Sequence, residues 1–179
     1  IFGDEPLQKR EAIDAIRQAC QQQGFDERLS FTQDPQFSWS DLEQAGQAMS
    51  LFSPRQLIEL ELTNNKPGQE GSKALTALMA QQNPDLILVL HGPKASQETQ
   101  RAKWFKTLEY QGLYVMITQP EGHRLQQWIA QRARSHGLNF EPEALQRFTA
   151  MFEGNLLAAN QEMEKLQLQL GQQRIDSAA

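Results

Sequence analysis

The chain has 179 residues, of which 39% are hydrophobic and 22% charged, and this is the composition of a folded globular protein rather than a disordered one. Its length suits one domain, or a medium domain with a small appendage. The net charge of −5 argues against a protein that as a whole coats nucleic acid or an anionic membrane.

Cysteine and histidine usage excludes several kinds of site. Cys20 is the single cysteine, so an internal disulfide and a cysteine-rich metal site are both excluded. The three histidines lie far apart and lack a metal-ligand spacing. No apolar run approaches the length of a membrane span and no signal peptide opens the sequence, so we expect a cytoplasmic protein without a membrane partner.

Strand and helix patterns alternate over the first two thirds of the chain. The sequence predicts strands at residues 1–2, 28–32, 56–62, 85–90 and 113–118, and helices at residues 6–23, 40–53, 72–81 and 97–110. Residues 85–90 and 113–118 are expected to be buried, whereas Glu59 and Glu61 alternate with apolar residues and predict that one face of their strand is wet or only partly covered. The βαβ alternation predicts a doubly wound parallel sheet with flanking helices.

The pattern changes at Gln119-Pro120, after which the sequence predicts no strand. Three helices are expected there, at residues 121–136, 142–152 and 156–170. We therefore expect an α/β domain over residues 1–119 and a small helical domain over residues 120–179. Because the chain opens on Ile1 without a methionine and ends without an obvious stop to the fold, we also expect a fragment of a longer protein.

The turn after the first strand stands where a phosphate-binding loop would carry Gly-x-x-x-x-Gly-Lys-Ser/Thr. It reads Gly3-Asp4-Glu5-Pro6, followed by Lys9. Two carboxylates stand where phosphate would bind, proline removes one N–H group, and the second glycine and the Lys-Ser/Thr pair are missing. We interpret it as a degenerate loop and expect no nucleotide cofactor.

The remaining strand ends do not predict catalysis. No Asp-Glu pair for magnesium follows Leu62, and His91 at the end of the fourth strand is more typical of a solvated or carbonyl-bonded histidine than of a catalytic one. The sequence thus predicts no catalytic residue, no cofactor and no metal site.

Three large apolar residues lie close together at the end of the second predicted helix, just before Pro54. They are Met49, Leu51 and Phe52. Met49 and Phe52 share the helical stripe of Leu42, which favours burial in the core, whereas Leu51 lies off that stripe. The residues alone leave two interpretations open: the three side chains close the core, or they form a plug for a partner.

Two locally basic sets could contact a phosphate backbone. Acidic neighbours dilute both, and a solvated helix face explains them as well. Their members are Lys94, Arg101, Lys103 and Lys106 in the first domain, and Arg124, Arg132 and Arg134 in the second.

Four stretches resemble the delta-subunit family of bacterial DNA polymerase III, the clamp-loader subunits of the AAA+ class that have lost their ATP site. The order and spacing of these stretches, rather than any one motif, make the likeness specific. They are Gly3-Asp4-Glu5-Pro6-Leu7, the run of residues 48–57, Lys94-Ala95-Ser96 with Trp104-Phe105, and Glu153-Gly154-Asn155-Leu156-Leu157 with Glu164-Lys165-Leu166.

The resemblance implies an AAA+/RecA-like domain, a three-helix lid, and a C-terminal collar domain that this chain lacks. It implies that Met49, Leu51 and Phe52 bind the sliding clamp and that the ring opens for loading onto primed DNA without ATP bound here. The implied partners are the clamp, the other loader subunits through the missing collar, and primer-template DNA within the full complex. The chain would not be catalytic by itself.

Two alternatives stay open. One is an ATP-hydrolysing AAA+ subunit or related P-loop enzyme, which the missing Lys-Ser/Thr pair disfavours. The other is a nucleic-acid-binding module that acts through the appended helices, for which a strongly salt-dependent DNA affinity would be typical.

Overall fold

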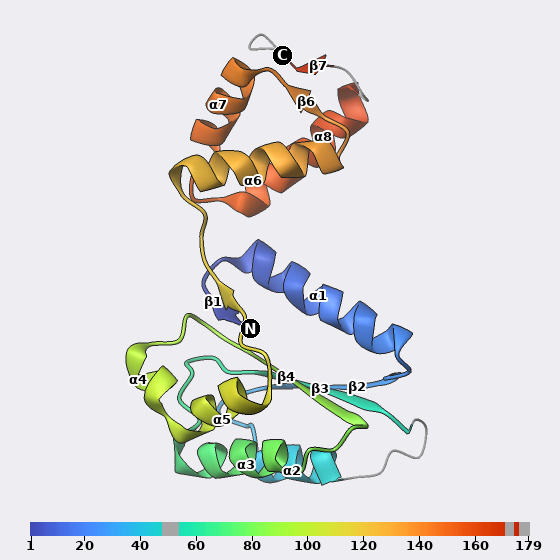
Figure 1. The fold of residues 1–179 in the computed structure, drawn as a ribbon, viewed down its shortest axis with the longest axis vertical. Coiled ribbons are helices and arrows are strands. Elements are labelled where there is room, and N and C mark those ends of the chain that lie inside the picture. Colours follow the sequence, from blue (N-terminus) through green and yellow to red (C-terminus); the bar gives the residue numbers. More distant parts are fainter. Residues whose placement is uncertain (48–53, 171–173, 176–179) are drawn as a thin grey trace. The chain divides into compact units, whose positions relative to one another are not determined.

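The computed structural model describes residues 1–47, 54–170 and 174–175 (Figure 1). The contacts divide the chain into two compact units. The first contains Ile1–Asp4 and Gln8–Ile117, and the second contains Glu5–Leu7 and Thr118–Ala179. Each unit is described by itself below.

The first unit is built on parallel strands. β2 pairs with β3 and β3 with β4, each over six residues, and β1 pairs with β5. An isolated parallel bridge joins Phe2 to Gly92, where Gly3 N–H donates to Gly92 O and Gly92 N–H donates to Ile1 O, so the strand order is β2-β3-β4-β1-β5. The strands are β1 (Phe2–Gly3), β2 (Glu27–Thr32), β3 (Gln56–Glu61), β4 (Leu86–His91) and β5 (Met116–Ile117).

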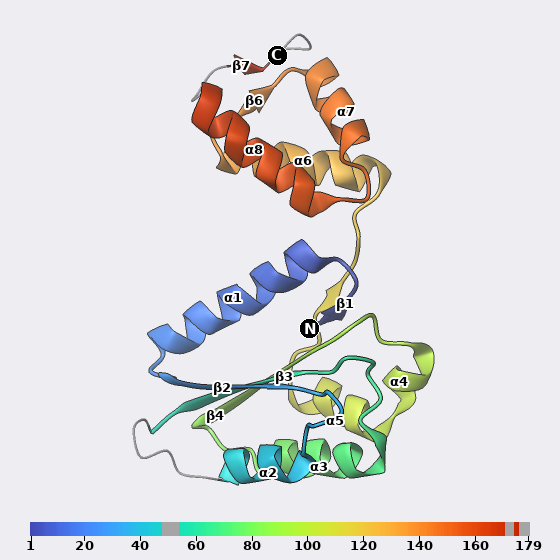
Figure 2. The same cartoon turned by 180° about the vertical axis from the view of Figure 1, so that it is seen from behind.

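Helices cover both faces of this sheet. The views from the front and from behind agree that α1 lies on one face while α2 and α3 lie on the other (Figures 1 and 2). The expected α/β fold with parallel strands and flanking helices is confirmed. The helices are α1 (Pro6–Gln22), α2 (Trp39–Gln47), α3 (Gly68–Ala80), α4 (Gln97–Arg101) and α5 (Lys103–Gln111).

The core of the first unit has one cluster on each face of the sheet. Leu57 of β3 packs in the cluster that contains Ile13 of α1, whereas its neighbour Ile58 packs in the cluster that contains Trp39 and Phe105. Successive side chains of a strand point to opposite faces, so β3 supplies both clusters. This double burial holds α1 against one side of the sheet and α2, α3 and α5 against the other.

Four predictions about this unit are wrong in detail. The expected wet or partly covered face of β3 is closed at Glu59, which is only 1% exposed, and stays exposed at Glu61, where the strand ends. The expected helix over residues 97–110 is interrupted at Ala102, whose ψ of 146° is extended. The expected buried strand over residues 113–118 shrinks to β5, with Leu113 81% exposed and Met116 54% exposed. α3 begins at Gly68 rather than at residue 72.

The second unit is mainly helical. Its core brings together Leu125, Ile129, Phe148 and Met163 from the three helices, and Leu7 packs with them. The prediction of no strand after residue 119 is wrong, because β6 and β7 pair in parallel. Two-residue segments are too short to show a period in the sequence. The elements are α6 (Gly122–Ser135), β6 (Asn139–Phe140), α7 (Pro142–Met151), α8 (Leu156–Leu170) and β7 (Arg174–Ile175).

None of the described helices combines the length and the apolar character needed to cross a membrane.

Candidate functional site

The turn from β1 to α1 begins at a glycine that the packing of the sheet requires. A Cβ atom added to Gly3 would lie 2.0 Å from the carbonyl oxygen of Ile117, far inside contact distance. The backbones of β1 and β5 therefore approach so closely that only glycine fits. Gly3 is explained by this approach, without a phosphate beside it.

The carboxylates of this turn accept hydrogen bonds from backbone N–H groups. Leu7 N–H donates to Glu5 Oε1 at 3.2 Å, and Lys94 N–H donates to Asp4 Oδ1 at 2.9 Å. Glu5 is only 2% exposed. The N–H groups at a helix start are the groups that bind phosphate in a P-loop, and here one of them binds the chain's own carboxylate. Pro6 contributes no N–H group.

Lys9 is the one basic side chain on the first turns of α1 that the sequence offered as a phosphate ligand. Its Nζ donates to the carbonyl oxygen of Gly3 at 3.1 Å and to that of Gly92 at 3.4 Å. The ammonium therefore bonds the ends of β1 and β4 to α1. Side chains of this turn and of α1 thus bond to backbone groups at the point where a phosphate-binding loop would stand.

Met49, Leu51 and Phe52 lie outside the described residues, but both flanks of their segment are defined. α2 ends at Gln47, and Gly46 packs so closely on α3 that an added Cβ would lie 2.3 Å from Leu78 Cδ1. On the other side, Pro54 and Arg55 precede β3 (Gln56–Glu61).

Arg55 anchors the second flank. Its Nη1 donates to Gln23 O at 2.6 Å, its Nε to Asp85 Oδ1 at 3.3 Å, and its guanidinium lies 5.5 Å from the centre of the Phe25 ring. Arg55 thus connects the start of β3 to the segments that precede β2 and β4. In a parallel sheet the amino ends of all strands lie on one side, and the turn after β1 lies on the opposite side, at the carboxyl ends. Arg55 and the turn after β1 therefore lie at opposite ends of the strands.

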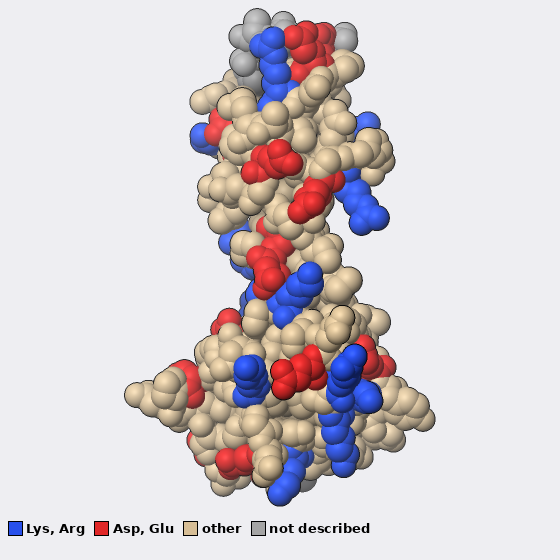
Figure 3. Space-filling model, turned by 90° about the vertical axis from the view of Figure 1, so that its left-hand side faces the viewer, with Lys and Arg blue, Asp and Glu red and all other residues tan. Residues whose placement is uncertain are grey.

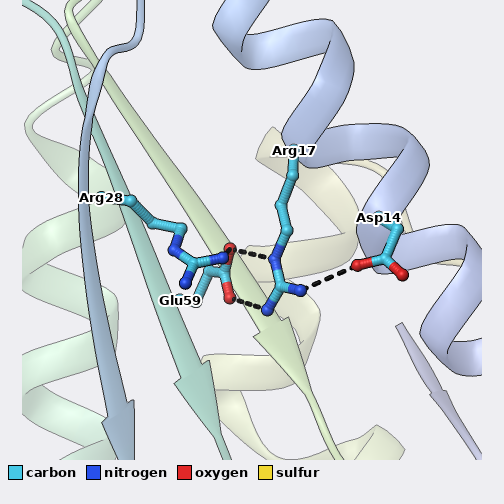
Figure 4. Close-up of polar contacts among 4 residues, drawn as sticks. All are labelled: Asp14, Arg17, Arg28 and Glu59. Carbon is cyan, nitrogen blue, oxygen red and sulfur yellow. Dashed lines mark hydrogen bonds and ion pairs between the residues drawn. The ribbon is translucent and has the colours of Figure 1, made fainter.

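An ion cluster forms around the buried carboxylate of Glu59, between α1 and the sheet (Figure 4). Arg17 of α1 donates from Nε and Nη2 to the two oxygens of Glu59 at 2.7 and 2.6 Å, and its Nη1 donates to Asp14 at 2.8 Å. Arg28 of β2 lies 3.9 Å from Glu59. Burial alone would raise the pKa of Glu59, but the hydrogen bonds and charge of Arg17 and the charge of Arg28 outweigh it and lower that pKa.

The sequence did not predict this cluster, because alternation in β3 suggested a wet face. One signal was present: Arg17 stands four residues after Ile13, on the face of α1 that packs on the sheet. A basic residue on a buried helical face calls for an acidic partner.

His91, the polar residue at the end of the fourth predicted strand, has its surroundings defined by the structure. This residue ends β4 and is half-buried, and burial is the largest cause that lowers the pKa of its ring. The charge of Glu61, its register partner on β3, acts in the opposite direction. Among the described residues, no group of three or more His, Cys, Asp and Glu side chains could hold a metal ion.

The members of each predicted basic set differ in their surroundings. Arg132 stacks on Trp128 at 4.7 Å and bonds to Asn160 at 3.3 Å, while Arg124 and Arg134 are exposed. Figure 3 shows basic and acidic side chains interspersed on the face that it presents. Of the first set, Arg101, Lys103 and Lys106 line one shallow hollow on α4 and α5, and Lys94 is not among its lining residues.

The fold and the turn after β1 define a class: parallel-sheet α/β proteins that keep the position of a phosphate-binding loop without its ligands. A family model described as "DNA polymerase III, delta subunit" matches residues 1–118. The chain belongs to this family.

Individual relatives agree with this assignment. The DNA polymerase III subunit delta of Escherichia coli (strain K12) is 36% identical over 168 residues, and that of Haemophilus influenzae is 31% identical over 171. Each alignment covers 94% of this chain and 49% of the relative. The chain therefore spans about half the length of these curated relatives.

A solved structure shares the fold. The DNA clamp loader delta protein of Bacillus subtilis superposes with a TM-score of 0.66 at 20% identity, covering 98% of this chain and 54% of that protein. At this identity the likeness concerns the fold alone.

Proposed function

We propose that this chain is the amino-terminal part of a clamp-loader delta subunit that binds the sliding clamp and opens its ring for loading onto primed DNA. The observation that carries the proposal is the family match over residues 1–118, which includes Met49, Leu51 and Phe52 as well as the degenerate loop. The loader of which it is part belongs to the DNA polymerase III holoenzyme, and the chain itself catalyses no reaction.

In this proposal Leu51 and Phe52 insert into an apolar pocket of the clamp, and Met49 packs beside them. Burying each side chain contributes about 1.5–3 kcal/mol before the costs of association. Two large anchors in one pocket are typical of a binding hot spot. Anchors next to the amino ends of the strands would favour a clamp conformation in which the nearby interface between clamp subunits is weakened. The ring could then open at that interface.

The proposal assigns the first unit to the AAA+ class and the helical unit to a lid, with a boundary near residue 119. It assigns no nucleotide to the chain, and the geometry at Glu5 and Lys9 supports this, because the polar groups of the turn already have partners within the chain. The same geometry disfavours an ATP-hydrolysing subunit. Contacts with the other loader subunits belong to a collar domain in the part of the family that this chain does not span.

Calorimetric titration with the cognate sliding clamp tests the proposal. We expect the Leu51→Ala/Phe52→Ala variant to bind at least about 30-fold more weakly, since each anchor at a hot spot contributes about 1–2 kcal/mol or more. Leu113→Ala is the matched control, because it removes an exposed apolar side chain from the same unit. Equal clamp affinity of the parent and the double variant, both shown to be folded, would contradict the proposal.

A further inference from the structure

One exposed face of α5 combines basic and aromatic side chains. Lys103, Lys106 and Tyr110 recur three and seven positions along the helix, so they share one face, and Arg101 of α4 lies beside them. With Thr107 and Gln111 these residues line a shallow hollow of about 500 Å³. The hollow lies wholly within the first unit.

Acidic residues flank this face but do not line it: Glu98 of α4 lies with Lys103 at a neighbouring hollow, and Glu109 belongs to α5. No acidic side chain lines the hollow, and Arg101, Lys103 and Lys106 form no ion pair within the described part of the chain. The face therefore suits a polyanion.

Tyr110 makes the face more than a set of cations. Its side chain is 90% exposed, whereas Trp104 and Phe105 hold the opposite side of α5 in the core. An exposed ring beside a basic stripe is the pattern on which single-stranded nucleic acids bind, with bases stacked on the ring and phosphates on the cations. A duplex keeps the faces of its bases covered and would use only the cations. Lys103 and Tyr110 lie about 10 Å apart along the helix axis, the length of about three stacked nucleotides.

We propose that Arg101, Lys103, Lys106 and Tyr110 form a site for single-stranded nucleic acid on the outer face of α4 and α5. Tyr110 stacks on one base, and the three cations contact the phosphates on either side of it. The site includes none of the residues assigned to the clamp, so nucleic-acid binding can be tested independently of clamp binding. It also differs from the appended helices that the sequence offered as a nucleic-acid surface.

Fluorescence anisotropy of the purified protein with a labelled oligothymidylate tests the site. We expect Tyr110→Ala to weaken binding about 10-fold and Tyr110→Phe to retain it, because only the alanine removes the ring. Lys106→Ala should reduce the slope of log affinity against log salt by about 0.7, the value for one phosphate contact on a single strand. Lys165→Ala, which removes an exposed lysine paired with Glu162 on α8, is the control and should change neither quantity.

The expected outcome also includes unchanged clamp affinity in Tyr110→Ala, since the two surfaces are separate. Oligothymidylate affinity that is equal in the parent and in folded Tyr110→Ala would overturn the site. Tighter binding of an oligoglutamate peptide than of the oligonucleotide, again without dependence on Tyr110, would overturn it in favour of an acidic protein partner.

Discussion

Arg17 on α1 holds both carboxylate oxygens of Glu59 on β3, at 2.7 and 2.6 Å. α1 begins at the turn after β1, and β3 begins four residues after Phe52, the last residue assigned to the clamp. The pair therefore connects α1, which begins at the carboxyl ends of the strands, to β3. Glu59 is buried while Arg17 is 35% exposed, so the carboxylate carries most of the desolvation cost.

Removing the arginine should destabilise the fold. Breaking a fully buried pair costs about 3–5 kcal/mol, but Arg17 is partly exposed and Arg28 stays near the carboxylate, so we expect about 2 kcal/mol for Arg17→Met. Urea unfolding monitored by circular dichroism measures this change. Arg147→Met is the control, because Arg147 and Glu143 form an exposed pair one helical turn apart, worth about 0.5 kcal/mol or less.

The double variant Arg17→Met/Glu59→Met separates a buried unpaired charge from lost packing. Replacing both partners by apolar residues of similar size is often neutral, so we expect the double variant to be more stable than Arg17→Met alone. A double variant less stable than either single variant would contradict the account, because it would mean that the pair itself contributes net stability.

The same carboxylate makes stability depend on acid. Arg17 and Arg28 lower the pKa of Glu59 below its ordinary value of 4.5, so the unfolded chain binds a proton at a higher pH than the folded one. This contribution is fully present above pH 4.5 and is lost as the pH falls through the lower folded pKa. In urea unfolding between pH 6 and about 3, Glu59→Gln should lose stability less steeply than the parent. An identical acid slope in the two proteins would exclude Glu59 as the cause.

The sequence predicted the order of the strands and helices well, because long periodic segments such as α1 and the apolar run of β4 carry a clear signal. It could not predict that Glu59 is buried and paired with Arg17. Alternation distinguishes polar from apolar positions, but it does not distinguish a solvated carboxylate from a carboxylate paired with a helix on the sheet. The break at Ala102 was equally hidden, because alanine favours helix and its extended backbone is a tertiary effect.

For the turn after β1, the sequence indicated which ligands of a phosphate-binding loop are missing, but not which groups the residues of the turn bond to. The residues of Gly3-Asp4-Glu5-Pro6 already excluded a standard phosphate loop, but only the structure assigns Glu5 to Leu7, Asp4 to Lys94 and Lys9 to two carbonyl groups. For Met49, Leu51 and Phe52 the choice between core and plug stays a prediction, since these residues lie outside the described part of the chain.

The filled turn predicts that the protein does not bind ATP. A phosphate would have to displace the Glu5 carboxylate from the Leu7 N–H group and meet the charge of Asp4 beside it. Isothermal titration with ATP and magnesium should show no heat of binding at protein concentrations of tens of micromolar. Glu5→Gln keeps an acceptor oxygen at the cap without the charge and should also fail to bind, because Lys9 remains bonded to the carbonyls of Gly3 and Gly92. A low-micromolar ATP affinity of the parent would refute the prediction and favour the ATPase alternative.

Gly3 should tolerate no side chain, for a reason unrelated to nucleotide. An alanine Cβ there would lie 2.0 Å from a backbone oxygen of β5, so the β1–β5 pair would have to separate, and we expect a loss of more than about 3 kcal/mol in urea unfolding. Gly46→Ala is the matched control: its Cβ meets only the end of the Leu78 side chain, which can turn away, and alanine favours the helix by about 1 kcal/mol. We expect Gly46→Ala to stay within about 1 kcal/mol of the parent. If Gly3→Ala were equally mild, the close approach of β1 and β5 would not be what requires glycine at this turn.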